Sequence, residues 1–120
     1  MTKNILIIED EKPLAKAMEL KLKKAGHNVQ VFYDGQGGLD AAAKQKFDVV
    51  LLDLIMPVLD GFQVLEKLNS MSYKPSIFVL SNLSQIEDEQ RAIKLGAKKY
   101  LVKSDTPLTT IVDYVNNTAT

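Results

Sequence analysis

Short apolar runs alternate with longer segments of helical periodicity along the whole chain. Three of the runs are continuous and rich in β-branched residues, which is typical of strands buried on both faces of a sheet. A fourth run alternates apolar and polar residues, as expected at a sheet edge, and a fifth is short. The predicted strands are Ile5–Ile8, Val49–Leu52, Ile77–Leu80, the edge strand Val29–Phe32, and Tyr100–Val102.

Between these runs, apolar residues recur every three or four positions, which predicts five helices. Gly26 and Gly96 are placed to end the first and the fourth helix, and Pro107 to begin the fifth. Asp34-Gly35 could form a hairpin turn, but the helical pattern after it favours a strand-to-helix loop. The apolar positions are Leu14, Met18, Leu22 and Ala25, then Leu39, Ala42 and Ala43, then Phe62, Leu65 and Leu68, then Ile86, Ile93 and Ala97, and finally Leu108, Ile111, Val112 and Val115.

Five strands that alternate with five helices predict an α/β fold, in which helices cover both faces of a parallel sheet. The length of 120 residues corresponds to one domain. We therefore expect residues 1–120 to form a single domain, with a polar tail at residues 116–120 that frays.

Composition and charge exclude several functions. Fifteen basic and fifteen acidic residues cancel, and the two halves of the chain carry net charges of only −1 and +1, so we expect no direct contact with nucleic acid. The absence of cysteine excludes a disulfide framework and a thiol nucleophile. No apolar run approaches the length of a membrane span, and the first residues do not resemble a signal peptide, so we expect a cytoplasmic protein without membrane contact.

Polar residues follow four of the predicted strands directly. Glu9-Asp10-Glu11 follows the first strand, Asp53 the third, Ser81 the fourth and Lys103 the fifth. In an open parallel sheet the carboxyl ends of the strands form the ligand crevice, so these side chains should meet at one edge. Taken singly, each has an ordinary explanation as a helix start, a cap, a loop hydroxyl or a surface lysine. Their joint placement favours a site.

Asp53 is flanked by apolar residues on both sides and is costly to bury without a partner. Near Glu9 and Asp10 it would also face like charges. A hard divalent cation such as Mg²⁺ and the Lys103 ammonium would relieve both costs. Such a site could receive a phosphoryl group, to which Ser81 could donate a hydrogen bond. His27 has no second histidine beside it, and we interpret it as a surface residue.

The chain resembles the receiver domain of two-component response regulators, the CheY-like family, over essentially its whole length. The matching motifs, in order, are Ile5–Glu11, Asp53–Gly61, Leu80-Ser81, Gly96-Ala97 and Tyr100–Lys103. The resemblance implies a doubly wound, flavodoxin-like (βα)5 sheet with strand order 2-1-3-4-5. It also implies that a sensor histidine kinase or a phosphotransfer protein donates the phosphoryl group.

The resemblance implies a role for each motif residue. Asp53 resembles the phosphoacceptor, and Lys103 the lysine that contacts the acyl phosphate. Asp10 resembles a direct Mg²⁺ ligand, Glu9 a ligand through water, and the Ile55 backbone carbonyl a further ligand beside Asp53. Ser81 and Tyr100 resemble the switch pair. Their movement would repack the face made by the fourth helix, the fifth strand and the fifth helix, where a downstream protein, an effector domain or a second copy binds.

The sequence departs from the family pattern in three respects. Ser104 replaces the usual proline after the lysine, so we expect a trans bond and a rearranged loop. Asn82 replaces a small residue and would narrow access to Asp53 or contact the phosphoryl group. Ile55 and Leu83 are apolar where the family tunes attack by water, which predicts slow self-dephosphorylation.

Four function classes compete. We favour a phosphorylation-controlled binding module, monomeric or dimerising on phosphorylation, which turns over no external substrate. A Mg²⁺-dependent phosphohydrolase would need an acid–base residue two positions after Asp53, where Ile55 stands. In a flavodoxin-like cofactor site, Glu9-Asp10-Glu11 would repel the phosphate group of the cofactor. The alternative kept open is a pseudo-receiver, a scaffold that acts without phosphorylation.

Overall fold

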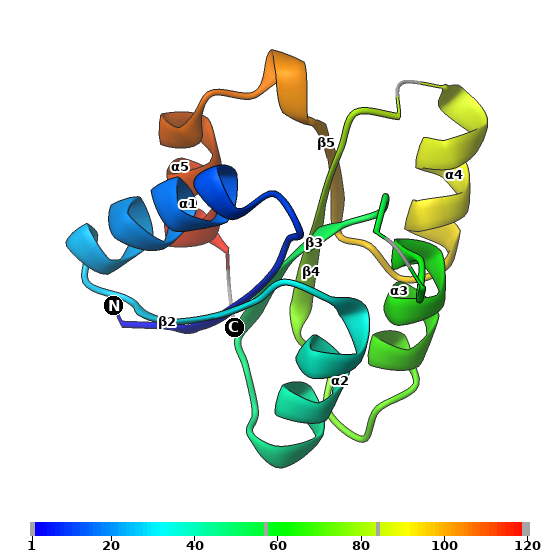
Figure 1. Ribbon diagram of the computed structural model, residues 1–120, viewed down its shortest axis with the longest axis horizontal. Coiled ribbons are helices and arrows are strands. Elements are labelled where there is room, and N and C mark those ends of the chain that lie inside the picture. Colours follow the sequence, from blue (N-terminus) through cyan, green and yellow to red (C-terminus); the bar gives the residue numbers. More distant parts are fainter. Residues whose placement is uncertain (1, 57, 84, 119–120) are drawn as a thin grey trace.

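Strands and helices alternate through residues 2–56, 58–83 and 85–118, which the computed structural model describes (Figure 1). Pro57, within the predicted Asp53–Gly61 motif, lies outside these residues. The elements are β1 (Asn4–Ile8), α1 (Lys12–Lys24), β2 (Asn28–Phe32), α2 (Gly35–Lys44), β3 (Val49–Asp53), α3 (Gly61–Asn69), β4 (Ser76–Ser81), α4 (Ile86–Lys94), β5 (Lys99–Val102), a 3-10 turn (Lys103–Asp105) and α5 (Leu108–Asn117).

The five strands form one parallel sheet in the order β2-β1-β3-β4-β5, which confirms the predicted fold class and strand order. The register aligns Asp53 with Leu80 and Ser81 with Val102. The polar ends of β3, β4 and β5 therefore lie in succession along one edge of the sheet. No helix among the described residues has the length and apolarity that a membrane crossing requires.

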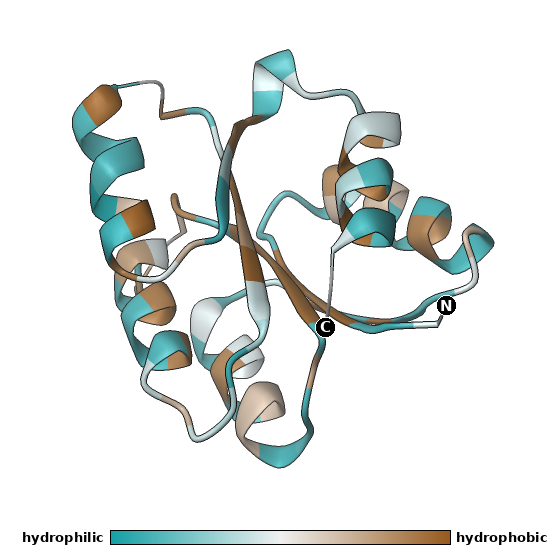
Figure 2. Cartoon of the chain, turned by 180° about the vertical axis from the view of Figure 1, so that it is seen from behind, coloured by the Kyte–Doolittle hydropathy of each residue, from teal (hydrophilic) through white to brown (hydrophobic). Residues whose placement is uncertain are grey.

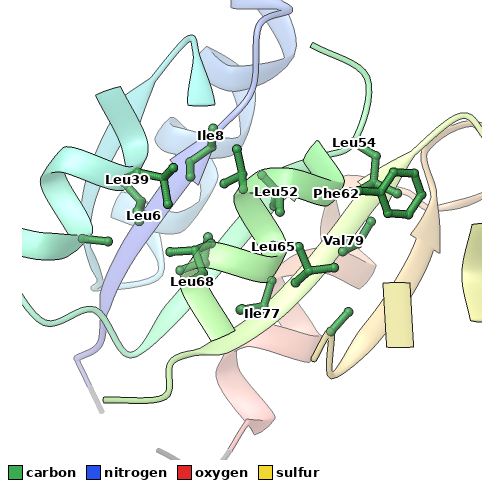
Figure 3. Packing of buried hydrophobic residues seen from close by; sticks show 14 of the residues in the cluster. Leu6, Ile8, Leu39, Leu52, Leu54, Phe62, Leu65, Leu68, Ile77 and Val79 are labelled. Carbon is green, nitrogen blue, oxygen red and sulfur yellow. The ribbon is translucent and has the colours of Figure 1, made fainter. Parts of the chain in front are cut away.

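Alternate apolar residues of each central strand point to opposite sides of the sheet, and helices cover both of these faces. Leu6 and Ile8 belong to the core under α2, α3 and α4, part of which Figure 3 shows. Ile5 and Ile7 belong to a second core under α1 and α5. Figure 2 shows the apolar strands running between polar helix surfaces. The two cores hold the sheet rigid, so the loops at its carboxyl edge have a fixed base.

Local signals define the helix ends much as predicted. Gly26 and Gly96 have φ angles of 98° and 116° after α1 and α4, a left-handed conformation that favours glycine. The Asp34 side chain accepts a hydrogen bond from the Gly37 N–H and begins α2, which confirms a strand-to-helix loop. Asp60 and Gln63 form a capping box at α3. α3 thus begins directly behind the loop that follows Asp53.

One expectation at the opposite edge of the sheet was wrong. His27 is only 5% exposed, because its Nδ1 accepts a hydrogen bond from the Lys3 N–H and its Nε2 lies 2.6 Å from Asn116 Oδ1. α5 continues through Asn117, so the predicted tail at residues 116–120 overlaps the end of this helix. Residues 119–120 of the predicted tail lie outside the described part of the chain.

Candidate functional site

A cavity of about 190 Å³ lies at the carboxyl edge of the sheet. It lies between the loops that follow β1, β3 and β4 and the end of β5. Of the predicted site residues, Asp10, Asp53, Ile55 and Lys103 line this cavity. The lining residues are Asp10, Glu11, Asp53, Ile55, Asn82 and Lys103.

Asp53 is the buried carboxylate at the centre of this site. It is only 3% exposed, and its Oδ1 accepts a hydrogen bond from the Ile55 N–H at 3.1 Å. Burial, followed by the charge of Glu9, raises the pKa of Asp53 to about 7, against the opposing effects of the Ile55 N–H and Lys103. Oδ2 faces Lys103 Nζ at 3.4 Å. The carboxylate is thus oriented by the backbone on one side and faces a cation on the other.

Lys103 is the cation shared by three carboxylates. Its Nζ lies 2.7 Å from Glu11 Oε2, 2.8 Å from Glu9 Oε1 and 3.4 Å from Asp53 Oδ2. Burial disfavours its charge, but the close contacts with the Glu11 and Glu9 carboxylates and the charge of Asp53 outweigh that cost and raise the pKa of Lys103. The ammonium therefore stays charged at every physiological pH.

Three carboxylates make a set of ligands suited to a divalent cation. Glu9, Asp10 and Asp53 each offer an oxygen, and these oxygens lie within 4.8 Å of one another. Glu9 Oε1 is buried, and no donor among the described residues makes a well-directed hydrogen bond to it, although Lys103 lies nearby. Buried carboxylate oxygens without a directed donor are suited to a hard cation, so the residues present fit Mg²⁺.

Ser81 and Tyr100 meet at the backbone of Leu83, beside the cavity. The buried Ser81 hydroxyl accepts a hydrogen bond from the Leu83 N–H at 3.1 Å, and the Tyr100 hydroxyl donates to the Leu83 carbonyl at 2.6 Å. Burial is the main cause that raises the pKa of Tyr100. The predicted switch residues therefore share one loop segment, and movement of that segment would alter both.

Of the positions that depart from the family pattern, Asn82 and Ile55 lie at the cavity as expected, whereas Leu83 does not. No described peptide bond is cis, so Lys103–Ser104 is trans, and it lies within the 3-10 turn Lys103–Asp105. Asn82 and Ile55 line the cavity, but Leu83 packs against the core beneath α4. Sequence reasoning assigned no role to Glu11, although its position between Asp10 and a helix start was a usable signal.

The protein comparisons identify the family. The model of the response regulator receiver domain matches residues 5–115. The response regulator ArlR of Staphylococcus aureus is 37% identical over 99 residues, which cover 82% of this chain and 45% of that protein. The transcriptional regulatory protein PcoR of Escherichia coli is 32% identical, with 82% and 44% covered. The chain therefore spans less than half the length of these relatives.

Solved structures agree in fold. The receiver domain of the Francisella response regulator 1452 superposes with a TM-score of 0.89 at 27% identity, covering 95% of this chain and 93% of that one. The Vibrio cholerae chemotaxis protein CheY4 superposes with a TM-score of 0.88 at 26% identity, covering 99% and 100%. Together with the strand order and the carboxylate cluster, these matches place the chain in the response regulator receiver domain family.

Proposed function

We propose that this domain is a phosphorylation-controlled switch in which Asp53 accepts a phosphoryl group. The observation that supports it most directly is the surroundings of Asp53, a buried carboxylate with Lys103 at 3.4 Å and further carboxylates of Glu9 and Asp10 close by. A histidine kinase or a phosphotransfer protein is the donor we propose, as for the response regulators that the chain resembles.

Each residue has a defined task in this proposal. An Asp53 oxygen forms a bond to phosphorus while the bond between phosphorus and the donor nitrogen breaks, and that nitrogen keeps the electron pair and takes up a proton from solvent. The Ile55 N–H holds the other Asp53 oxygen in place. Lys103 neutralises charge on the phosphoryl oxygens, and the Ser81 hydroxyl donates a hydrogen bond to one of them.

Glu9, Asp10 and Asp53, with the Ile55 backbone carbonyl, are the groups we propose to hold Mg²⁺. The bound cation would supply positive charge beside the oxygens of the phosphoryl group. Without it, burial and the charge of Glu9 raise the pKa of Asp53 and disfavour the ionised nucleophile. The requirement for a cation therefore follows from the burial and crowding of the carboxylates themselves.

The output we propose is a change on the face formed by α4, β5 and α5. When Ser81 turns toward the phosphoryl group, its hydrogen bond with the Leu83 N–H is lost, and the segment that holds Tyr100 is released. A downstream protein, an effector domain or a second copy would read that face. The domain itself turns over no external substrate, and self-dephosphorylation is slow because Ile55 presents an apolar side chain to the cavity.

Intact-mass analysis after incubation with acetyl phosphate tests the proposal. We expect a single phosphoryl adduct that requires Mg²⁺, is lost in Asp53→Ala and remains in the control Asp40→Asn, which alters an exposed acid on α2. An adduct that persists in Asp53→Ala would assign the acceptor elsewhere. No adduct with acetyl phosphate or with a phosphorylated histidine donor would favour the pseudo-receiver.

A further inference from the structure

Glu11 makes a contact that its place in the chain does not require. It is the N-cap residue of α1, yet its side chain makes no capping hydrogen bond to the helix. Instead, its carboxylate reaches across the cavity to Lys103 at the end of β5, at 2.7 Å. This ion pair joins the start of the first helix to the end of the last strand.

The pair draws the Lys103 ammonium toward the mouth of the cavity. The Glu11 side chain is 57% exposed and that of Lys103 is 11% exposed, so the pair runs outward from the buried floor. Of the three carboxylates around the ammonium, Asp53 is the most distant. The position of Lys103 is therefore set by Glu11 and Glu9 rather than by the acceptor.

A phosphoryl group on Asp53 changes what Lys103 must contact. The group adds about two negative charges, and the ammonium has to direct a donor to its oxygens. An interaction that is stronger before the reaction than in the transition state slows the reaction. We propose that Glu11 restrains Lys103 in the unphosphorylated protein, and that it thereby lowers both the rate of phosphorylation and the affinity for a bound phosphoryl group. This inference rests on the proposed function.

The test compares three variants with the wild type. Glu11→Gln removes the charge, Glu11→Asp keeps the charge but shortens the reach to Lys103, and Glu19→Gln removes an acid that pairs with Lys16 and Lys23 on the outer side of α1. Because Glu11 makes no capping bond, α1 does not depend on its carboxylate. Thermal unfolding of each variant verifies that it is folded.

Two quantities are measured in the presence of Mg²⁺. The first is the rate of phosphorylation by acetyl phosphate. The second is the affinity for beryllium trifluoride, a phosphoryl mimic, which fluorine NMR measures. A partly exposed ion pair of this kind predicts that Glu11→Gln and Glu11→Asp each raise both quantities about two- to fivefold, while Glu19→Gln leaves them unchanged.

Three results would overturn the inference. Wild-type values in Glu11→Gln would show that the pair does not restrain Lys103. Wild-type values in Glu11→Asp beside raised values in Glu11→Gln would assign the effect to general repulsion at the cavity mouth. An equal rise in Glu19→Gln would assign it to net charge. If the wild type binds neither phosphoryl group nor mimic, the proposed function itself fails, which is a different outcome.

Discussion

Lys3 Nζ lies 2.9 Å from the backbone carbonyl oxygen of Val115, so the residue before β1 binds the end of α5. The same ammonium donates to the Asn116 carbonyl at 3.1 Å, and Lys3 is buried. Carbonyl groups in the last turn of a helix lack partners within the helix, and a cation there also interacts favourably with the helix dipole. Lys3 thus fastens the last helix to the first strand.

Replacing Lys3 by Met should destabilise the fold by about 1–3 kcal/mol, because the Val115 and Asn116 carbonyl groups lose the ammonium donor and Val115 keeps only the Thr118 N–H. Urea unfolding followed by circular dichroism measures the change. Lys16→Met, which removes an exposed lysine from α1, is the matched control and should change stability by less than about 0.5 kcal/mol. Equal effects of the two substitutions would contradict the role given to Lys3.

Gly61→Ala should destabilise the protein by about 2 kcal/mol or more and slow phosphorylation. A Cβ at this position would overlap the Leu54 backbone and the Asp53 carbonyl oxygen, neither of which can yield without moving the acceptor. At Gly37, a Cβ would approach only the Phe32 ring and the Asp34 side chain, so Gly37→Ala should be far milder. The measurements are urea unfolding and the phosphorylation rate, and unchanged phosphorylation in Gly61→Ala would refute the link.

Asp53 should give the metal-free protein a distinctive dependence of stability on pH. Its pKa rises from 3.8 to about 7 on folding, so between these values the folded state binds more protons than the unfolded state. The contribution of Asp53 to the free energy of unfolding therefore falls as pH rises through this window, and the loss is complete above about pH 7.

Asp53→Asn should remove this pH-dependent loss in the free energy of unfolding. In EDTA we expect the variant to exceed the wild type by roughly 1–3 kcal/mol at pH 8 and by little near pH 4. Asp40→Asn, which alters an exposed acid on α2, is the control for the loss of one acidic group. Urea unfolding at several pH values measures both variants. A difference between Asp53→Asn and the wild type that does not change with pH would show that folding does not raise the pKa of Asp53.

Mg²⁺ should raise the unfolding temperature of the wild type. A cation that binds only the folded state stabilises it by about 1.4 kcal/mol at ten times its dissociation constant, equivalent to about 3–6 °C for a domain of this size. The shift should disappear in Glu9→Gln and in Asp53→Asn, and remain in Glu19→Gln. Differential scanning fluorimetry in MgCl₂ and in EDTA measures it, and an equal shift in all four proteins would exclude the Glu9-Asp10-Asp53 cluster as the site.

The sequence by itself determined the elements of the fold and the edge at which the site would form. Each central strand contains four consecutive apolar residues, as at Val49–Leu52, because both faces of the sheet are covered. Asp53 and Lys103 were predicted as site residues because a polar residue directly after such a strand must lie at its carboxyl end. These signals are local, so they can be recognised without knowing which other elements of the chain lie against each strand.

Only the tertiary structure decided which polar groups meet across long separations in the chain. Glu11 and Lys103 are 92 residues apart, and Lys3 and Val115 are 112 apart. His27 resembles a surface residue in its turn, yet it is buried because the start of β1 and the end of α5 converge on it. Leu83 lies two residues after Ser81, and its side chain packs, partly buried, against the core under α2, α3 and α4. Such contacts depend on how strands and helices pack together, and hydrophobic periodicity records only which face of an element is buried, not which residues of other elements lie against it.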